Sequence, residues 1–246
     1  MMDIVTKLLG PSSRTEKPRS HGITILLDKG LGPNAIDDIG TVCGAHCDYA
    51  KIAWGSLLIS GGLEAKIAAY RRHGIEPKIG GTLFEYAYAN DKVEDLLVLV
   101  QELKIHVEIS DGVIKLPRRE RLALISKFAA RVNVFSELGG KLSAQDLDFV
   151  AAAKEDLAAG AKKVVIEGRE VGPVGKPIRT DLVDRLLDAL PVEDMVFESL
   201  ERPQQVFFIK RVGANVNLGN ILPKDLMTVE CFRRGLKEHT FLDKPV

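Results

Sequence analysis

The sequence predicts an α/β protein of the (β/α)8 TIM-barrel class, built as a single domain. Three observations favour this fold: the chain has 246 residues, short β-branched runs recur along it, and longer amphipathic segments separate these runs. A closed barrel of this class takes roughly 250 residues, which the length matches. A doubly wound open sheet is the alternative that the same alternation permits. We expect residues 1–20 to form an N-terminal arm and residues 21–246 to form the barrel.

Eight apolar runs are the predicted strands, and each is followed by a polar or glycine-rich break. They span residues 23–27, 49–53, 75–79, 105–109, 132–135, 164–166, 195–197 and 215–218. Each interval between neighbouring runs holds enough chain for one helix and its loops. Eight strands at this spacing predict a closed barrel built from eight successive strand-helix units.

Three of the intervening segments show apolar residues at helical spacing, which predicts helices that cover one face of a sheet. The stripes are Val93, Leu96, Leu97, Val100 and Leu103; Leu182, Leu186, Leu187 and Leu190; and Leu226, Val229, Phe232 and Leu236. Gly74 and Gly160 follow helical segments, where a left-handed residue often ends a helix. Pro117 and Pro223 stand where a helix would begin.

The charge balance excludes two classes of partner. The chain has 34 Lys and Arg against 34 Asp and Glu, so its net charge is zero. Nucleic acids and anionic membrane surfaces both attract a basic excess, which is absent here. No stretch approaches the ~20 apolar residues of a membrane span, and no signal-peptide core is present. We therefore expect a cytoplasmic protein that binds neither nucleic acid nor membrane.

The three cysteines do not predict a disulfide framework, because they are few and odd in number. Cys43, His46 and Cys47 have helical spacing and could share a metal ion. A fourth ligand is missing, and small cysteines commonly pack helices, so packing is the favoured interpretation.

Ionisable and amide side chains gather at the predicted C-terminal ends of the strands, where barrel enzymes carry their chemistry. The acidic ones are Asp28, Glu108, Asp111, Glu137, Glu167 and Glu198, and the basic ones are Lys29, Lys51, Lys78 and Arg169. Any one of them could be half of a buried ion pair. Together they indicate a site for a small anionic substrate, because buried charge is costly without a partner. The carboxylate excess favours a divalent cation, with Mg2+ as the natural choice.

The same segments resemble the phosphosulfolactate synthase family, in order and over almost the whole chain. The resemblance is carried by Lys17-Pro18-Arg19, Asp28-Lys29-Gly30-Leu31-Gly32, Trp54-Gly55, Gly80-Gly81-Thr82-Leu83-Phe84-Glu85, Ile109-Ser110-Asp111-Gly112, Ser136-Glu137, Glu167-Gly168-Arg169-Glu170, Phe197-Glu198, Gln204-Gln205, Asn215-Val216-Asn217-Leu218 and Arg233-Arg234-Gly235-Leu236. It implies a (β/α)8 lyase that adds sulfite to C3 of phosphoenolpyruvate with Mg2+, giving (2R)-phospho-3-sulfolactate. The pathway would be coenzyme M biosynthesis or formation of another sulfonate, and a homo-oligomer is expected.

This resemblance also implies roles for the residues. The expected catalytic residues are Lys51, Lys141, Lys29 and Arg169, and the expected Mg2+ ligands are Glu108, Asp111, Glu137 and Glu167. The expected substrate-binding residues are Asp28, Lys78, Gly80, Gly81, Thr82, Ser110, Ser136, Asn217, Gly219 and Asn220. A lysine with a pKa lowered by burial among cations is the expected proton donor to C2.

Three loops depart from the family pattern. Gly140 stands where relatives commonly carry the first of two lysines, Val171 replaces a serine, and Ser199-Leu200 replaces Ala-Pro. These changes leave open a different nucleophile that adds to the same enolpyruvate. Two further alternatives are a non-catalytic, heat-stress-associated homologue and a Schiff-base aldolase that uses Lys51 or Lys163.

Overall fold

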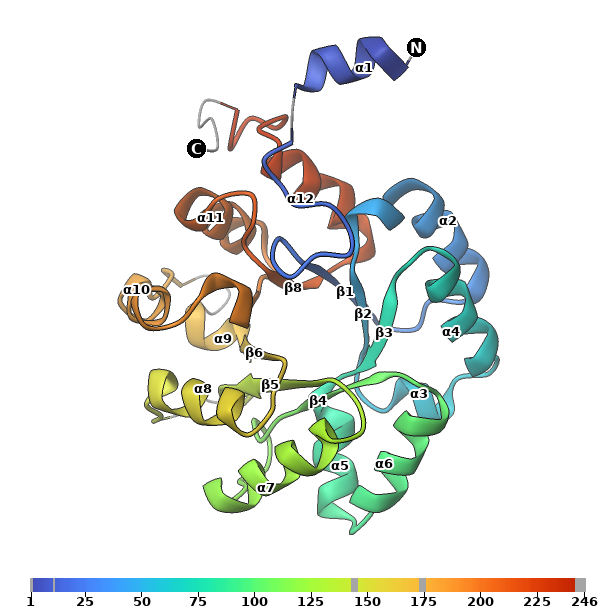
Figure 1. The fold of residues 1–246 in the computed structure, drawn as a ribbon, viewed down its shortest axis with the longest axis vertical. Helices are drawn as coiled ribbons and strands as arrows, with labels where there is room; N and C mark the ends of the chain where they lie inside the picture. Colours follow the sequence, from blue (N-terminus) through green and yellow to red (C-terminus); the bar gives the residue numbers. More distant parts are fainter. Residues whose placement is uncertain (1, 11, 143–145, 173–175, 242–246) are drawn as a thin grey trace.

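Eight parallel strands form a closed barrel in the computed structural model, which describes residues 2–10, 12–142, 146–172 and 176–241 (Figure 1). The strands are β1 (Thr24–Asp28), β2 (Tyr49–Ile52), β3 (Glu76–Ile79), β4 (His106–Ile109), β5 (Val134–Leu138), β6 (Lys163–Ile166), β7 (Met195–Glu198) and β8 (Leu218–Ile221). They pair in chain order, and β8 closes on β1. The predicted (β/α)8 barrel is therefore confirmed, and the open sheet is wrong. Residues 242–246, which end the predicted barrel domain, lie outside the described residues.

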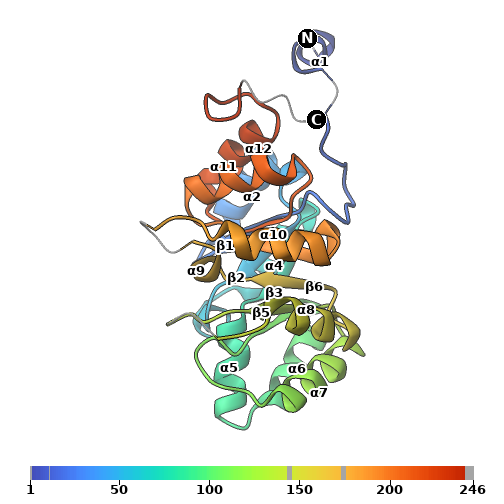
Figure 2. The same cartoon turned by 90° about the vertical axis from the view of Figure 1, so that its left-hand side faces the viewer.

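Helices surround the barrel on its outside, except for α1, which lies apart from the barrel beyond α12 (Figures 1 and 2). They are α1 (Met2–Leu9), α2 (Pro33–Cys43), α3 (Ser56–Ile59), α4 (Leu63–Arg72), α5 (Gly81–Ala89), α6 (Val93–Glu102), α7 (Arg118–Ala129), α8 (Phe149–Ala158), α9 (Gly168–Val171), α10 (Thr180–Ala189), α11 (Arg202–Val212) and α12 (Leu226–Arg233). Short 3-10 turns lie at η1 (Gly44–His46), η2 (Val192–Asp194) and η3 (Pro223–Asp225). Within the described ranges, no helix is both long and apolar enough to cross a membrane.

The predicted helical stripes lie on α6, α10 and α12. Leu96, Leu97 and Val100 of α6 are buried against the barrel. Gly74 and Gly160 have φ values of 62° and 109°, as expected for residues that end α4 and α8. Leu236 is an exception: it lies beyond the end of α12 and is 51% exposed.

Large apolar side chains fill the interior of the barrel in its N-terminal half. This cluster comprises Ile23, Ile25, Tyr49, Phe135, Val165 and Val196. Because side chains alternate across a strand, the residue two positions later on the same strand also points inward, one layer nearer the C-terminal end. This rule places Lys51 above Tyr49, Glu137 above Phe135 and Glu198 above Val196. The packed lower layer thus supports a charged upper layer.

Two strands lie further along the chain than the sequence predicts. β5 covers Val134–Leu138, so Ser136 and Glu137 are part of the strand and do not follow it. β8 covers Leu218–Ile221, where residues 215–218 were expected. The run at 215–218 is apolar only at alternate positions, and its asparagines bind backbone groups of the N-terminal arm and at the starts of β1 and β7 instead. This shift moves Asn217 to the N-terminal end of the barrel.

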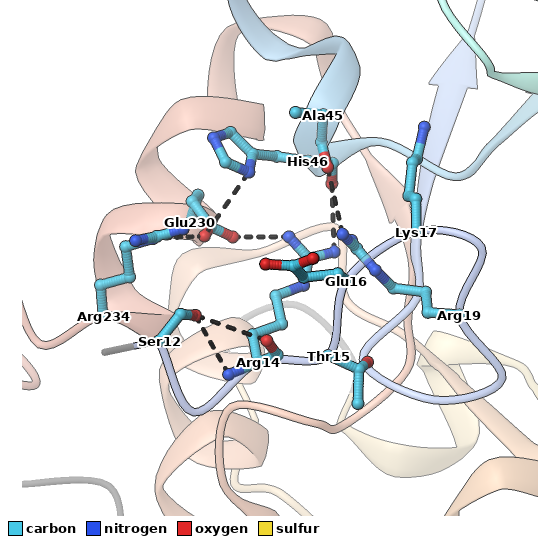
Figure 3. A pocket seen from close by; sticks show the side chains of 10 residues that line it. All are labelled: Ser12, Arg14, Thr15, Glu16, Lys17, Arg19, Ala45, His46, Glu230 and Arg234. Atoms are coloured by element: carbon cyan, nitrogen blue, oxygen red, sulfur yellow. Dashed lines mark hydrogen bonds and ion pairs between the residues drawn. The ribbon is translucent and has the colours of Figure 1, made fainter. Parts of the chain in front are cut away.

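The N-terminal arm lies against α12, η1 and the start of β1 (Figure 3). Arg14 is buried, and its guanidinium pairs with Glu230 at 2.5 Å and donates to the carbonyl oxygen of Gly22 at 2.8 Å. The Lys17 ammonium donates to the carbonyl oxygens of Gly44 and Gly74, each at 2.8 Å. These contacts give the basic residues of the arm a structural role, and those of Lys17 satisfy backbone carbonyls just beyond the ends of α2 and α4.

The cysteines pack the fold, as the sequence predicts. Cys43 and Cys47 are buried in the main apolar cluster, and all three cysteines are free. The His46 imidazole lies 3.5 Å from a carboxylate oxygen of Glu230, not between the two thiols. Among the described residues, Cys43, His46 and Cys47 do not form a metal-binding group.

Candidate active site

One ammonium and three carboxylates meet in the upper layer of the barrel. Lys51 Nζ lies 2.6 Å from Glu108 Oε1, 3.2 Å from Glu137 Oε2 and 2.7 Å from Glu198 Oε1. One oxygen of each carboxylate lies within 4.8 Å of the other two. We call Glu108, Glu137 and Glu198 the three-glutamate cluster. All three are buried, so these charges interact through protein and little water.

Other donors hold each member of the three-glutamate cluster from its second oxygen. Lys78 contacts Glu108 Oε2, and Lys141 lies 2.9 Å from Glu137 Oε1. The backbone N–H of Gly168 donates to Glu198 Oε2 at 3.3 Å. The directions of the three carboxylates are therefore fixed independently of the lysine at their centre.

The two central lysines have opposite pKa shifts. Burial disfavours the charge of Lys51, but the three carboxylates outweigh this penalty and raise its pKa well above the ordinary value. Burial lowers the pKa of Lys78, and its partner Glu108 opposes that shift. Burial also disfavours the charge of Lys141, but Glu137 and Glu85 raise its pKa. The expected lysine with a lowered pKa among cations is therefore wrong for Lys51 and Lys141, which lie among carboxylates.

The carboxyl groups show that negative charge is in excess here. Burial raises the pKa of Glu137 to about 7 despite the opposing charge of Lys51. Burial, with Glu198 and Glu137 nearby, raises the pKa of Glu167 to about 9. Glu108, in contrast, has a pKa held well below the ordinary value by Lys51 and Lys78, which overcome burial. The four carboxyl groups, together with Glu85, outnumber the three ammonium groups of Lys51, Lys78 and Lys141, so the negative charge is incompletely balanced.

Asp111 and Glu167 do not join the three-glutamate cluster, although both were expected as metal ligands. Asp111 pairs with Arg121 at 2.8 Å on the helix side of β4. Glu167 begins α9, where its carboxylate accepts from the N–H of Arg169 at 3.4 Å. Glu198, which the sequence places at the C-terminal rim of the barrel, provides the third carboxylate of the cluster because it points inward from β7.

Two expected substrate-binding residues point outward from the barrel, away from this layer. Asp28 accepts from Tyr70 Oη at 2.8 Å, pairs with Lys66 at 2.6 Å and caps the N–H of Gly30 at 2.7 Å. Ser136 Oγ accepts from Arg121 at 2.7 Å. Both residues occupy strand positions whose neighbours face inward, and alternation sends them to the helices. They stabilise the site from outside and do not line it.

Asn217 and Lys163 lie at the opposite end of the barrel. Asn217 accepts from the N–H of Ile23 at 2.9 Å and donates to the carbonyl of Met195 at 2.8 Å. Lys163 donates to the carbonyl oxygens of Ser20, at 2.8 Å, and Glu193. The substrate-binding role expected for Asn217 is therefore wrong, and Lys163 cannot serve as a Schiff-base lysine at this site.

The glycines after β3 do contact the charged layer. The N–H of Gly81 donates to Glu108 Oε1 at 3.0 Å. A Cβ atom at Gly80 would stand 3.2 Å from Cε of Lys51, so a larger residue would crowd the lysine stem. Thr82 follows them, half-buried in the first turn of α5.

Gly219 and Asn220 of β8 lie near β7. A Cβ atom at Gly219 would stand 3.2 Å from Val196 and 3.8 Å from Glu198. Asn220 has φ 56°, and its buried Oδ1 has no hydrogen-bond partner among the described residues. A left-handed residue with an unpaired buried oxygen carries strain of the kind that concentrates at binding sites.

Lys29 and Arg169 are exposed, so they belong to the outer rim and not to the buried layer. The Lys29 ammonium lies 5.9 Å from the ring centre of Trp54, a cation–π contact. Trp54 itself has φ 54° and is 53% exposed.

Two helix residues that the strand ends do not reveal hold the rim loops. Glu85 of α5 accepts from Ser110 Oγ at 2.5 Å, from Val113 N at 2.7 Å and from Lys141 Nζ at 2.8 Å. Arg121 of α7, 1% exposed, donates to the backbone oxygen of Glu137 at 2.8 Å. Glu85 stands in a rim segment and could have been found there. Arg121 lies in a charged helical segment, where the sequence alone predicts an ordinary surface arginine and does not indicate a contact with the site.

Two of the three altered loop positions do not face this site. Val171 is fully buried in the apolar core around α10, and Ser199 is buried with its Oγ on the carbonyl oxygen of Phe197 at 3.1 Å. Gly140 lies on the rim, where its N–H donates to Glu170 at 3.0 Å. The next residue, Lys141, reaches the site directly. Gly140 is therefore an altered position that directly adjoins a residue of the charged layer.

The fold and the site define a (β/α)8-barrel protein whose charged layer lies at the C-terminal end, the end at which barrel enzymes carry their active sites. Comparison with known proteins gives the family. A sequence model of the (2R)-phospho-3-sulfolactate synthase family matches residues 12–239. The chain belongs to this family of enzymes.

Relatives support the assignment over nearly the full length. The chain is 37% identical over 242 residues to the phosphosulfolactate synthase of Methanothermobacter thermautotrophicus, covering 92% of this chain and 94% of the relative. It is 32% identical over 243 residues to the phosphosulfolactate synthase of Bacillus subtilis, covering 93% and 95%. The crystal structure of 3-hexulose-6-phosphate synthase from Salmonella typhimurium is similar in fold, with a TM-score of 0.56 at 12% identity over 89% of this chain and 96% of that one.

Proposed function

We propose that this protein is a carbon-sulfur lyase that adds sulfite to C3 of phosphoenolpyruvate with Mg2+ and forms (2R)-phospho-3-sulfolactate. The observation that carries the proposal is the contact of Lys51 with three buried glutamates at the C-terminal end of the barrel. This group lies where the family resemblance expects the reaction. Its charges suit a reaction in which negative charge develops on a small anion.

The three-glutamate cluster fits a hard divalent cation. Its carboxylate oxygens are the donors that Mg2+ prefers, and burial raises the pKa of Glu137 to about 7, so the negative charge of this residue is incompletely balanced by the lysines. Glu108, Glu137 and Glu198 would hold the ion, in place of the originally expected set that included Asp111 and Glu167. When bound, Mg2+ supplies positive charge that stabilises the aci-carboxylate formed as sulfite attacks.

The chain's own residues account for charge and proton transfer. Sulfite donates its sulfur lone pair to C3, the C2–C3 π electrons move to C2, and C2 then takes a proton. Lys29 and Arg169 on the outer rim offset the repulsion between two anionic substrates. Lys141, partly exposed between Glu85 and Glu137, is the lysine that we assign as the proton donor to C2. Its ammonium stays charged at neutral pH, and a C2 carbanion is a stronger base than a lysine amine.

Phosphorus NMR tests the proposal directly. The protein is incubated with phosphoenolpyruvate, sulfite and Mg2+, and the phosphoenolpyruvate signal should give way to that of a saturated phosphate ester. Parallel samples lack sulfite, contain a chelator, or contain the Glu137→Gln variant, and each should leave the signal unchanged. Persistence of phosphoenolpyruvate in the complete mixture would contradict the proposal.

A second candidate is addition of a different nucleophile to the same enolpyruvate. Gly140 favours it, because this rim position lacks the lysine side chain of relatives and so offers less positive charge near Lys141. The same NMR experiment with thiosulfate or a thiol in place of sulfite separates the two. Restoring the lysine with Gly140→Lys should raise sulfite turnover if the loss of charge matters.

A further inference from the structure

The Lys51 ammonium occupies the point where the three-glutamate cluster converges. Glu108 Oε1, Glu137 Oε2 and Glu198 Oε1 all face it, at 2.6, 3.2 and 2.7 Å. A protein cation thus already stands where three carboxylate oxygens would coordinate a metal ion. The lysine and a divalent cation cannot occupy this point together, because both need the same three oxygens.

The cluster does not depend on Lys51 for its shape. Lys78 and Lys141 hold the outer oxygens of Glu108 and Glu137, and the N–H of Gly168 holds that of Glu198. The N–H of Gly81 adds a second donor on Glu108 Oε1 at 3.0 Å. With these anchors in place, the three inner oxygens stay converged after the ammonium leaves, at the cost of mutual repulsion that only another cation can relieve.

Lys51 has the means to leave. Its side chain is 9% exposed, whereas that of Lys78 is fully buried, so of these two lysines Lys51 is the one with contact to solvent. A lysine stem has four rotatable bonds and a compact charge. A Cβ atom at Gly80 would stand 3.2 Å from Cε of Lys51, so the glycine leaves space beside this stem that a larger residue would fill.

We infer that Lys51 and a divalent cation are alternative occupants of the three-glutamate cluster, and that the cation, on binding, turns the Lys51 ammonium out toward the substrate. The inference deepens the proposed function and rests on it for the choice of Mg2+. It makes metal binding a precondition for the role of Lys51: without the metal the glutamates hold the ammonium, and with the metal the ammonium is free to pair with an anion. The cation is thus expected to bind before the substrates.

Manganese binding to the full-length protein tests this exchange without any assay of turnover. Mn2+ is titrated into wild type, Lys51→Met and Lys163→Met, and free Mn2+ is followed by electron paramagnetic resonance. Lys51→Met removes the competing ammonium and should bind Mn2+ at least 10-fold more tightly than wild type. Lys163→Met is the matched control: it removes an equally buried lysine at the other end of the barrel and should bind like wild type.

A third variant identifies the ligands. Adding Glu198→Gln to Lys51→Met should abolish the gain in affinity, because it replaces one of the three charged carboxylates with a neutral amide. Lys51→Gln serves in place of Lys51→Met if the latter fails to fold, as judged by its circular dichroism melt. Equal affinity of wild type and the Lys51 variant, or absence of Mn2+ binding in that variant, would overturn the inference.

The failure of the proposed function would look different. A tighter Mn2+ site in Lys51→Met together with unchanged phosphoenolpyruvate in the NMR experiment would uphold the exchange and remove the sulfite reaction.

Discussion

The two ends of the barrel both bury charge, but they use it differently. At the N-terminal end, Arg233 donates to the carbonyl oxygens of Ala214, Val216 and Ile23. At the C-terminal end, Lys51 contacts carboxylates and no backbone group among the described residues. Backbone carbonyl oxygens at the N-terminal end likewise accept hydrogen bonds from the side-chain nitrogens of Lys17, Lys163 and Asn217.

The difference shows which buried charges are available for chemistry. A guanidinium bound to three carbonyls closes the barrel and cannot leave without exposing unsatisfied backbone acceptors. An ammonium held only by carboxylates can be exchanged for another cation. Burial of charge alone therefore does not mark the active site, whereas shared and unbalanced carboxylates do.

The largest effect should come from Lys51→Met at the C-terminal end. Turnover should fall about 1000-fold, as is typical when one charge-stabilising group is removed from an active site. The rate is followed by phosphorus NMR, with folding checked by circular dichroism. Lys163→Met, the same change at the N-terminal end, should keep wild-type turnover per folded molecule. Equal losses in the two variants would remove the distinction between the two ends.

Arg233→Met should affect stability and leave turnover alone. Removing the guanidinium takes its donor from the buried carbonyls of Ala214 and Val216, whereas that of Ile23 keeps the N–H of Leu218, and the free energy of unfolding should fall by about 3 kcal/mol. Urea denaturation measures this change. Arg211→Met, which breaks an exposed pair with Asp184, should cost less than about 1 kcal/mol. A large fall in kcat of folded Arg233→Met would mean that the N-terminal end takes part in catalysis.

Arg121→Met should show a mixed effect, because this residue holds β4 and β5 from outside the site. We expect kcat to fall about 10-fold with KM little changed, and stability to fall by about 2 kcal/mol, since Asp156 and Asp111 each lose one charged partner. Steady-state kinetics and denaturation measure the two effects. Arg119→Met, an exposed neighbour on α7, is the control and should change neither. Unaltered kcat in Arg121→Met would show that its role is stability alone.

The smallest effect concerns Glu85 and depends on pH. Burial opposes its charge, but Lys141 and Ser110 lower its pKa below the ordinary 4.5. A lowered pKa in the folded state gives stability that is present above the unfolded pKa and is lost as pH falls through the folded value. Glu85→Gln should therefore cost about 1.5 kcal/mol at pH 7, and the difference from wild type should shrink below pH 4.5.

Denaturation curves between pH 3 and pH 7 measure this trend. Glu94→Gln, which alters an exposed carboxylate on α6, is the control and should show no such pH dependence. A Glu85→Gln penalty that stays constant across this range would contradict the assignment of a charged Glu85.

Sequence periodicity predicted most of the fold because strands and helices are recorded in local patterns. The spacing of apolar runs located the eight strands, and glycines such as Gly74 marked helix ends. The register of β8 was missed because Asn217 has side-chain hydrogen bonds with the backbone near β7 and β1, and such long-range contacts leave no local pattern.

For the site, sequence by itself determined which residues stand at the C-terminal ends of the strands, and with them Lys51, Glu108, Glu137 and the family. Only the tertiary structure decided which of those residues face one another. Alternation turned Asp28 and Ser136 outward and brought Glu198 inward, and closure of the barrel placed β2, β4, β5 and β7 around one ammonium. The physical reason is that the identity of a charge is local, whereas its partners and its pKa depend on groups brought close only by folding.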